Sequence, residues 1–175
     1  DVYKRQIDLS EAGQTWYIHS GIVDKSSPFY GDYINDSSKG SNGGTSDTLA
    51  ISLNSGFGTY LQSLCPYNEV KKGFSETLRY YSDYRLKDYS EISNNKDTLK
   101  SKIVSNGAVT VHYPSITDCY SYDYANYYSD NTCIGIGDSH LIVVVGWDDN
   151  YSKDNFTGKV KPSNDGAWPV SYTHL

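Results

Sequence analysis

The fold is decided by the stretch Ser139-His140-Leu141-Ile142-Val143-Val144-Val145-Gly146-Trp147-Asp148-Asp149. Its apolar part, 141–147, is rich in β-branched residues and predicts a buried strand, because such side chains pack well on a pleated sheet. A histidine at the start of a buried strand can hold its imidazole rigidly at the edge of a cleft. A general base needs that rigidity and a pKa near neutrality. Taken alone, such a histidine is more often a structural residue, so its role depends on the rest of the chain.

Helical patterns precede this strand. Ser10 is suited to cap the first helix, with Glu11 in its first turn. Asn95 is suited to cap the third, and Gly107 to end it. Three helices are therefore predicted, at residues 8–19, 45–55 and 95–106, with a loop rich in Gly, Ser, Asn and Asp over 20–44.

The strand patterns follow the helices. Residues 108–113 alternate enough to predict a strand, and 166–168 predict the start of another. Between the first strand and His140 lies a polar, tyrosine-rich excursion over 115–137. An order of helices first and strands later is typical of an α+β fold rather than an alternating α/β fold.

Composition excludes several classes of protein. The 175 residues carry 15 Lys+Arg against 21 Asp+Glu, a formal net charge of -6. This acidic balance argues against a nucleic-acid partner, which requires a basic surface. No apolar run approaches the roughly 20 residues of a membrane-spanning helix, so no membrane span is expected in this segment. With 18 tyrosines and 14% aromatic residues, the chain is also unlike a disordered one.

The two ends share an unusual relation. The codons GAT GTG TAT AAG AGA CAG would encode residues 1–6, and the reverse complement of that DNA, read in a shifted frame, would encode residues 170–175. We therefore expect 1–6 and 169–175 to be translated sequencing adapter, like a fusion scar. On this interpretation the natural segment is 7–168, an internal piece of a longer protein and a partial domain.

Several short motifs occur in a fixed order along 8–168. They are Leu9-Ser10-Glu11, Asn42-Gly43-Gly44, Pro66-Tyr67, the His140-to-Gly146 strand, the run Gly146–Tyr151 and the run Asn164–Trp168. In this order they resemble the papain-like cysteine peptidases, particularly their secreted bacterial branch. The resemblance implies a papain-like two-subdomain fold, here partial: the end of the helical subdomain and much of the β-barrel-like subdomain.

The resemblance also implies a reaction. A cysteine thiolate attacks the peptide carbonyl, a histidine moves the proton, and an asparagine orients the imidazole. His140 matches the histidine. The nucleophilic cysteine is expected near or before residue 10 and the orienting asparagine after Trp168, so both are expected to be missing from 7–168. The resemblance implies a peptide or protein substrate, an extracellular or cell-surface location, and no cofactor.

A different class of function stays open: a catalytically inactive surface binding module that keeps the papain fold. The residue at the nucleophile position upstream would separate the two, because serine, glycine or alanine there would favour the binding module.

The substrate-binding residues follow from the same resemblance. Gly43 and Gly44 would let a substrate backbone approach and pair, although a simple turn is the alternative. Ser139, Leu141 and His112 would lie near the pocket for the side chain next to the cleaved residue. For His112 a partly exposed strand histidine is the plainer interpretation.

The cysteines are in unsuitable contexts for a nucleophile. Cys65, Cys119 and Cys133 each lack the neighbouring residues of the family motif, and Cys119 could instead pair with Cys133 across the excursion. No Cys/His spacing indicates zinc.

Two further features have competing interpretations. Asp148, Asn150 and Ser152 match the first ligands of a calcium loop, but Lys153 stands where glycine is required, so no metal is predicted. The excursion tyrosines could stack on glycans or simply pack polar loops. They are Tyr113, Tyr120, Tyr122, Tyr124, Tyr127 and Tyr128.

Overall fold

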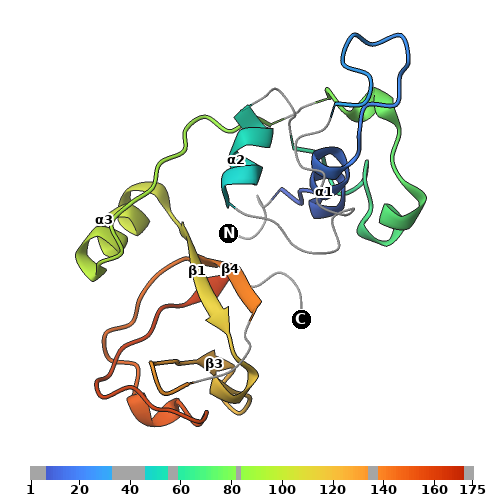
Figure 1. Ribbon diagram of the computed structural model, residues 1–175. Helices are drawn as coiled ribbons and strands as arrows, with labels where there is room; N and C mark the ends of the chain where they lie inside the picture. Colours follow the sequence, from blue (N-terminus) through green and yellow to red (C-terminus); the bar gives the residue numbers. More distant parts are fainter. Residues whose placement is uncertain (1–6, 33–45, 55–58, 82–83, 134–137, 172–175) are drawn as a thin grey trace. The chain divides into compact units, whose positions relative to one another are not determined.

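A computed structural model describes residues 7–32, 46–54, 59–81, 84–133 and 138–171. Two compact units divide the chain, Asp1–Ser90 and Glu91–Leu175 (Figure 1). The first holds α1 (Glu11–His19), α2 (Ser46–Asn54) and the 3-10 turns η3 (Tyr67–Lys72) and η4 (Glu76–Leu78). The second holds α3 (Lys96–Asn106), β1 (Val109–Ser115), η5 (Thr117–Cys119), β2 (Tyr120–Ser121), β3 (Asn126–Tyr127), β4 (Asp138–Val144), η6 (Lys153–Asn155) and β5 (Val170–Ser171). No helix among these described segments is long and apolar enough to cross a membrane.

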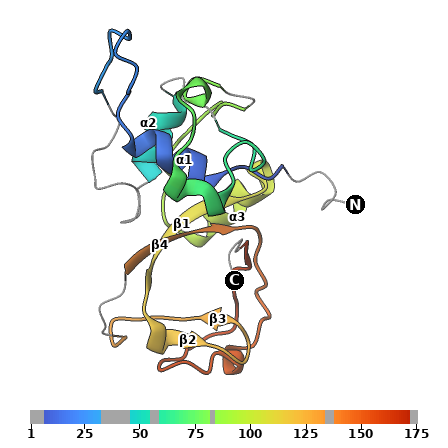
Figure 2. The same cartoon turned by 90° about the vertical axis from the view of Figure 1, so that its right-hand side faces the viewer.

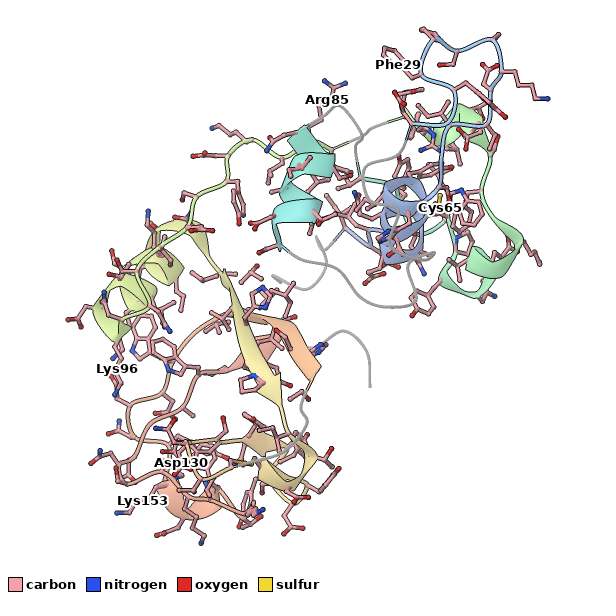
Figure 3. All side chains as sticks on the ribbon, in the orientation of Figure 1. Phe29, Cys65, Arg85, Lys96, Asp130 and Lys153 are labelled. Atoms are coloured by element: carbon pink, nitrogen blue, oxygen red, sulfur yellow. A yellow bond between two sulfur atoms is a disulfide. The ribbon has the colours of Figure 1, made fainter. Side chains whose placement is uncertain are left out.

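The core of the first unit lies beside α1. Tyr17, Tyr60 and Cys65 are at most 1% exposed and pack together, with Trp16 and Phe74 against them. Figure 3 labels Cys65 in this first unit. Gly13 allows this approach, because a Cβ there would come within 2.9 Å of the Cys65 Cβ. The absence of a side chain at Gly13 therefore lets α1 pack closely against the Cys65 side chain.

A buried cation closes this core. Arg79 is 1% exposed and makes two charge-assisted hydrogen bonds to Glu76, at 2.7 and 2.8 Å. Two further donors reach the carbonyls of Tyr17 and Gly21, each at 3.1 Å. A buried charge is tolerated only when it is paired and hydrogen-bonded in this way.

The predicted helix caps are confirmed. Ser10 accepts a hydrogen bond from the Gly13 amide at 2.8 Å, and the Asn95 side chain accepts one from the Thr98 amide at 2.9 Å. Gly107 ends α3 in the left-handed conformation at φ 88°, which glycine adopts without steric cost. All three predicted helices are present, within a few residues of the expected bounds.

The second unit is built on an antiparallel sheet of order β1-β4-β5, in which β1 and β4 lie side by side (Figure 1). A separate pair, β2 and β3, forms a short hairpin (Figure 2). Two helices in the first unit, followed in the second by α3 and then antiparallel strands, confirm the α+β class. The hairpin lies within residues 115–137. From the sequence, this segment was recognised only as polar and rich in tyrosine.

The strand bounds differ from the sequence prediction. The structure places β4 at Asp138–Val144 rather than 141–147, so His140 lies inside the strand and not at its start. The prediction of a buried strand is also wrong for the described residues: Val144 is 4% exposed, but Val143 is 37% and Val145 is 44% exposed. Alternate side chains point to opposite faces of the sheet, and only one face is covered within this unit.

The predicted strand at 166–168 is a single bridge, in which Ala167 pairs with Asp148. The two-residue strand β5, at Val170–Ser171, pairs with Val144 and Val143. This strand falls within residues 169–175, which we expect to be translated adapter.

Candidate active site

His140 lies in β4 directly opposite Tyr113 of β1. The two rings make an edge-to-face contact, with centroids 5.8 Å apart and planes at 67°. Both side chains are half-buried. Cross-strand partners share a face of the sheet, so His140 faces the same way as Ile142 and the buried Val144. The imidazole is thus held against packed side chains on one side.

The predicted pocket residues gather on the opposite face. His112 is the cross-strand partner of Leu141, and Ser139 is the partner of Pro114. The His112 Nδ1 lies 3.1 Å from the Ser139 Oγ, within hydrogen-bond distance. His112 and Ser139 are exposed, whereas Leu141 is half-buried. The structure therefore brings these three residues together, but on the face that the His140 side chain does not occupy.

The other two predicted substrate residues, Gly43 and Gly44, lie outside the described residues.

All three cysteines of the chain lie among the described residues, one as a free thiol and two bonded to each other. Cys65 is fully buried, and its burial raises the pKa of the thiol above its ordinary value. A buried thiol with a raised pKa is a poor source of thiolate. Cys119 and Cys133 form a disulfide, a pairing that the sequence left open as one possibility.

Sequence reasoning did not connect the tyrosines to His140. Tyr113 contacts the Tyr127 ring edge-to-face at 4.9 Å, as well as the imidazole. The sequence showed both tyrosines only as members of an aromatic-rich stretch. The sequence does not reveal the register of β1 against β4. A shift of one residue in that register would turn Tyr113 to the other face of the sheet.

The calcium-like run forms an ordinary turn. Asp148 Oδ1 accepts a hydrogen bond from the Asn150 amide at 2.9 Å, which is the local bonding typical of an Asp turn. Within the described ranges, no three His, Cys, Asp or Glu side chains gather in a way that could hold a metal ion.

The second-unit geometry is therefore a half-buried histidine on an antiparallel strand, with an exposed histidine–serine pair on the other face of the sheet. Residues 29–165 match the family model described as papain family cysteine protease. No match was found among curated proteins.

Two of the solved structures that resemble the chain are of clostridial cysteine proteases. One contains the cysteine protease and lectin-like domains of Cwp84, a surface layer associated protein of Clostridium difficile, with 26% identity and a TM-score of 0.71. The other is a variant of the clostridial cysteine protease Cwp84 after propeptide cleavage, with 28% identity and a TM-score of 0.68.

The matches cover most of this chain but only part of those proteins. Each alignment includes 95% of this chain, against 35% and 39% of the solved chains. The family match includes His140 and the strands that carry it. Over most of its length, then, the chain belongs to the papain family of cysteine proteases.

Proposed function

We propose that this chain is part of a cysteine endopeptidase in which His140 is the general base and acid. The observation that carries the proposal is the position of His140: a half-buried imidazole, packed against Tyr113, within the segment that matches the family. A base must be held in one geometry to remove a proton efficiently.

The proposed reaction has two steps. A cysteine sulfur forms a thioester with the substrate carbonyl carbon, the peptide C–N bond breaks, and the His140 imidazolium gives its proton to the leaving amine. Water then attacks the thioester, and His140 takes a proton from that water. The cysteine recovers its thiolate when the acid product leaves.

In this proposal the nucleophilic cysteine and the orienting asparagine come from segments outside residues 7–168. Support comes from the three cysteines of the chain, because Cys65 is buried and Cys119 is bonded to Cys133. Neither state provides a thiolate at neutral pH.

The proposed substrates are peptides or proteins, met outside the cell or at its surface. The contact of His112 with Ser139, next to Leu141, supports a pocket for the side chain beside the cleaved residue. These side chains and the imidazole point to opposite faces of the sheet. Gly43 and Gly44 would bind the substrate backbone.

The test begins with the DNA that flanks the codons for Ile7 and Trp168. The parent protein is then expressed, and peptide hydrolysis is measured before and after thiol alkylation. We expect His140→Ala to lower kcat by at least about 10³-fold, the scale set by removing a base from such a catalytic group. His19→Ala, in the first unit, is the matched control and should leave kcat unchanged.

The 175-residue chain by itself should show no thiol-dependent hydrolysis. Alkylation-sensitive turnover by this chain, abolished in His140→Ala, would overturn the external placement of the nucleophile. A parent protein without an upstream cysteine and without hydrolysis would instead support the binding module.

A further inference from the structure

A continuous series of aromatic rings leads away from His140. Tyr113 contacts the imidazole, with centroids 5.8 Å apart. On its other side, Tyr113 meets Tyr127 at 4.9 Å, with the ring planes at 69°. Each edge-to-face contact of this kind stabilises the pair of rings beyond the effect of their burial. We call His140, Tyr113 and Tyr127 the aromatic series.

The far end of the aromatic series is fixed to the backbone. The Tyr127 hydroxyl donates a hydrogen bond to the carbonyl of Pro114, the residue that follows Tyr113. Tyr127 also lies in β3, opposite Tyr120 of β2. Its ring is therefore tied both to β1 and to the hairpin.

The hairpin itself is held in place by polar contacts and a covalent bond. The Asn126 side chain donates to the Tyr151 hydroxyl at 2.9 Å and to the Asn155 carbonyl at 3.1 Å. The Cys119–Cys133 disulfide spans the hairpin, and the Cys119 carbonyl accepts a hydrogen bond from the Tyr128 amide at 3.2 Å. The contacts that hold Tyr127 in place thus extend to the Cys119–Cys133 disulfide.

We propose that Tyr113 is a positioning residue for the His140 imidazole and that Tyr127 holds Tyr113 in place. The inference rests on the proposed role of His140 as general base. An imidazole on a strand turns about two side-chain bonds, and a ring packed against it removes part of that freedom. Tyr113 acts through His140 and has no contact with the substrate in this mechanism.

This role predicts an effect on turnover rather than on binding. An interaction that aligns the base affects the reacting complex, so its loss lowers kcat with little change in KM. The aromatic ring of residue 113 is what matters, and the conservative variant with a phenyl ring should restore it.

The experiment measures kcat and KM of the parent peptidase on one peptide substrate. Tyr113→Leu should lower kcat about 10- to 100-fold, the penalty of a misplaced catalytic group, with KM changed by less than about twofold. Tyr113→Phe should recover kcat to within about threefold, because it keeps the edge-to-face contact. Tyr122→Leu is the matched control, since Tyr122 belongs to the same unit and is 75% exposed; its kcat should equal that of the wild type.

A second variant keeps the test decisive if Tyr113→Leu does not fold. Tyr127→Leu removes the support for Tyr113 without touching His140, and it should lower kcat by a smaller factor. Thermal melting identifies which variants are folded. An unchanged kcat in a folded Tyr113→Leu, or in a folded Tyr127→Leu if Tyr113→Leu is unfolded, overturns the positioning role while His140→Ala still tests the base. A wild-type parent without hydrolysis overturns both proposals.

Discussion

Three weak acids are buried side by side in the first unit: Tyr17, Tyr60 and Cys65. Burial raises the pKa of both phenols and of the thiol above their ordinary values. The unfolded chain therefore loses these protons at lower pH than the folded chain does. Their contribution to stability is complete below the unfolded pKa values, about 8.5 for Cys and about 10 for Tyr, and it is lost as the pH rises through and beyond them.

Urea unfolding followed by tryptophan fluorescence between neutral and alkaline pH should show this loss. The unfolding midpoint is expected to fall above pH of about 9, and to fall less steeply in Tyr60→Phe because one titrating group is gone. Tyr67→Phe is the matched control, since Tyr67 is in the same unit and 57% exposed. A midpoint that stays constant with rising pH contradicts the expectation.

At the residue scale, sequence reasoning succeeded where the signal is local. The caps Ser10 and Asn95 are confirmed because a capping side chain bonds within its own helical turn. It did not identify Arg79 as a buried residue. In the sequence Arg79 resembles a surface charge, and only the folded chain places Glu76 and two distant carbonyls within hydrogen-bond distance of it. The assignment of His140 came from a family motif, so its catalytic role stays a prediction.

At the element scale, α3 depends on its polar ends more than on a buried face. Within it only Ile103 is buried. Asn95→Ala should therefore lower the free energy of unfolding by about 1 kcal/mol, because the Thr98 amide loses its acceptor. Chemical denaturation measures the change. Asn94→Ala, one residue outside the cap, should have no effect, and equal losses in both variants would show that capping is not the cause.

The bounds of β4 show what an apolar run predicts and what it does not. The run 141–147 indicated a strand correctly, but the polar residues Asp138 and Ser139 extend it at the N-terminal end. Asp138 and Ser139 belong to the strand because β1 continues to Ser115 and so provides pairing partners for them. Pairing is set by the neighbouring strand, and residue type alone does not encode which partner a strand meets.

At the scale of the whole chain, the two units differ in the oxidation state of their cysteines. The first contains the free, buried Cys65, and the second contains the Cys119–Cys133 disulfide. The family match spans 29–165 and so reaches into both units. The sequence predicted the α+β class, because the order of helical and strand patterns is visible in it, but it left the pairing of the three cysteines open. It did not predict the β2–β3 hairpin, whose strands are only two residues each and depend on the packing around them.

The bridge predicts a unit-specific response to reduction. It links residues 14 apart, and closing a loop of this size stabilises a domain by about 2–4 kcal/mol, mainly by restricting the unfolded chain. A reductant should therefore increase the rate of amide hydrogen exchange within 91–175, most of all in the hairpin between Cys119 and Cys133. Exchange measured by mass spectrometry, with and without reductant, assigns the change to peptides. The double variant Cys119→Ser, Cys133→Ser should exchange rapidly in both conditions and show no response. If that variant still responds to reductant, or if the peptides around Cys65 respond first, the disulfide is not the element that stabilises this unit.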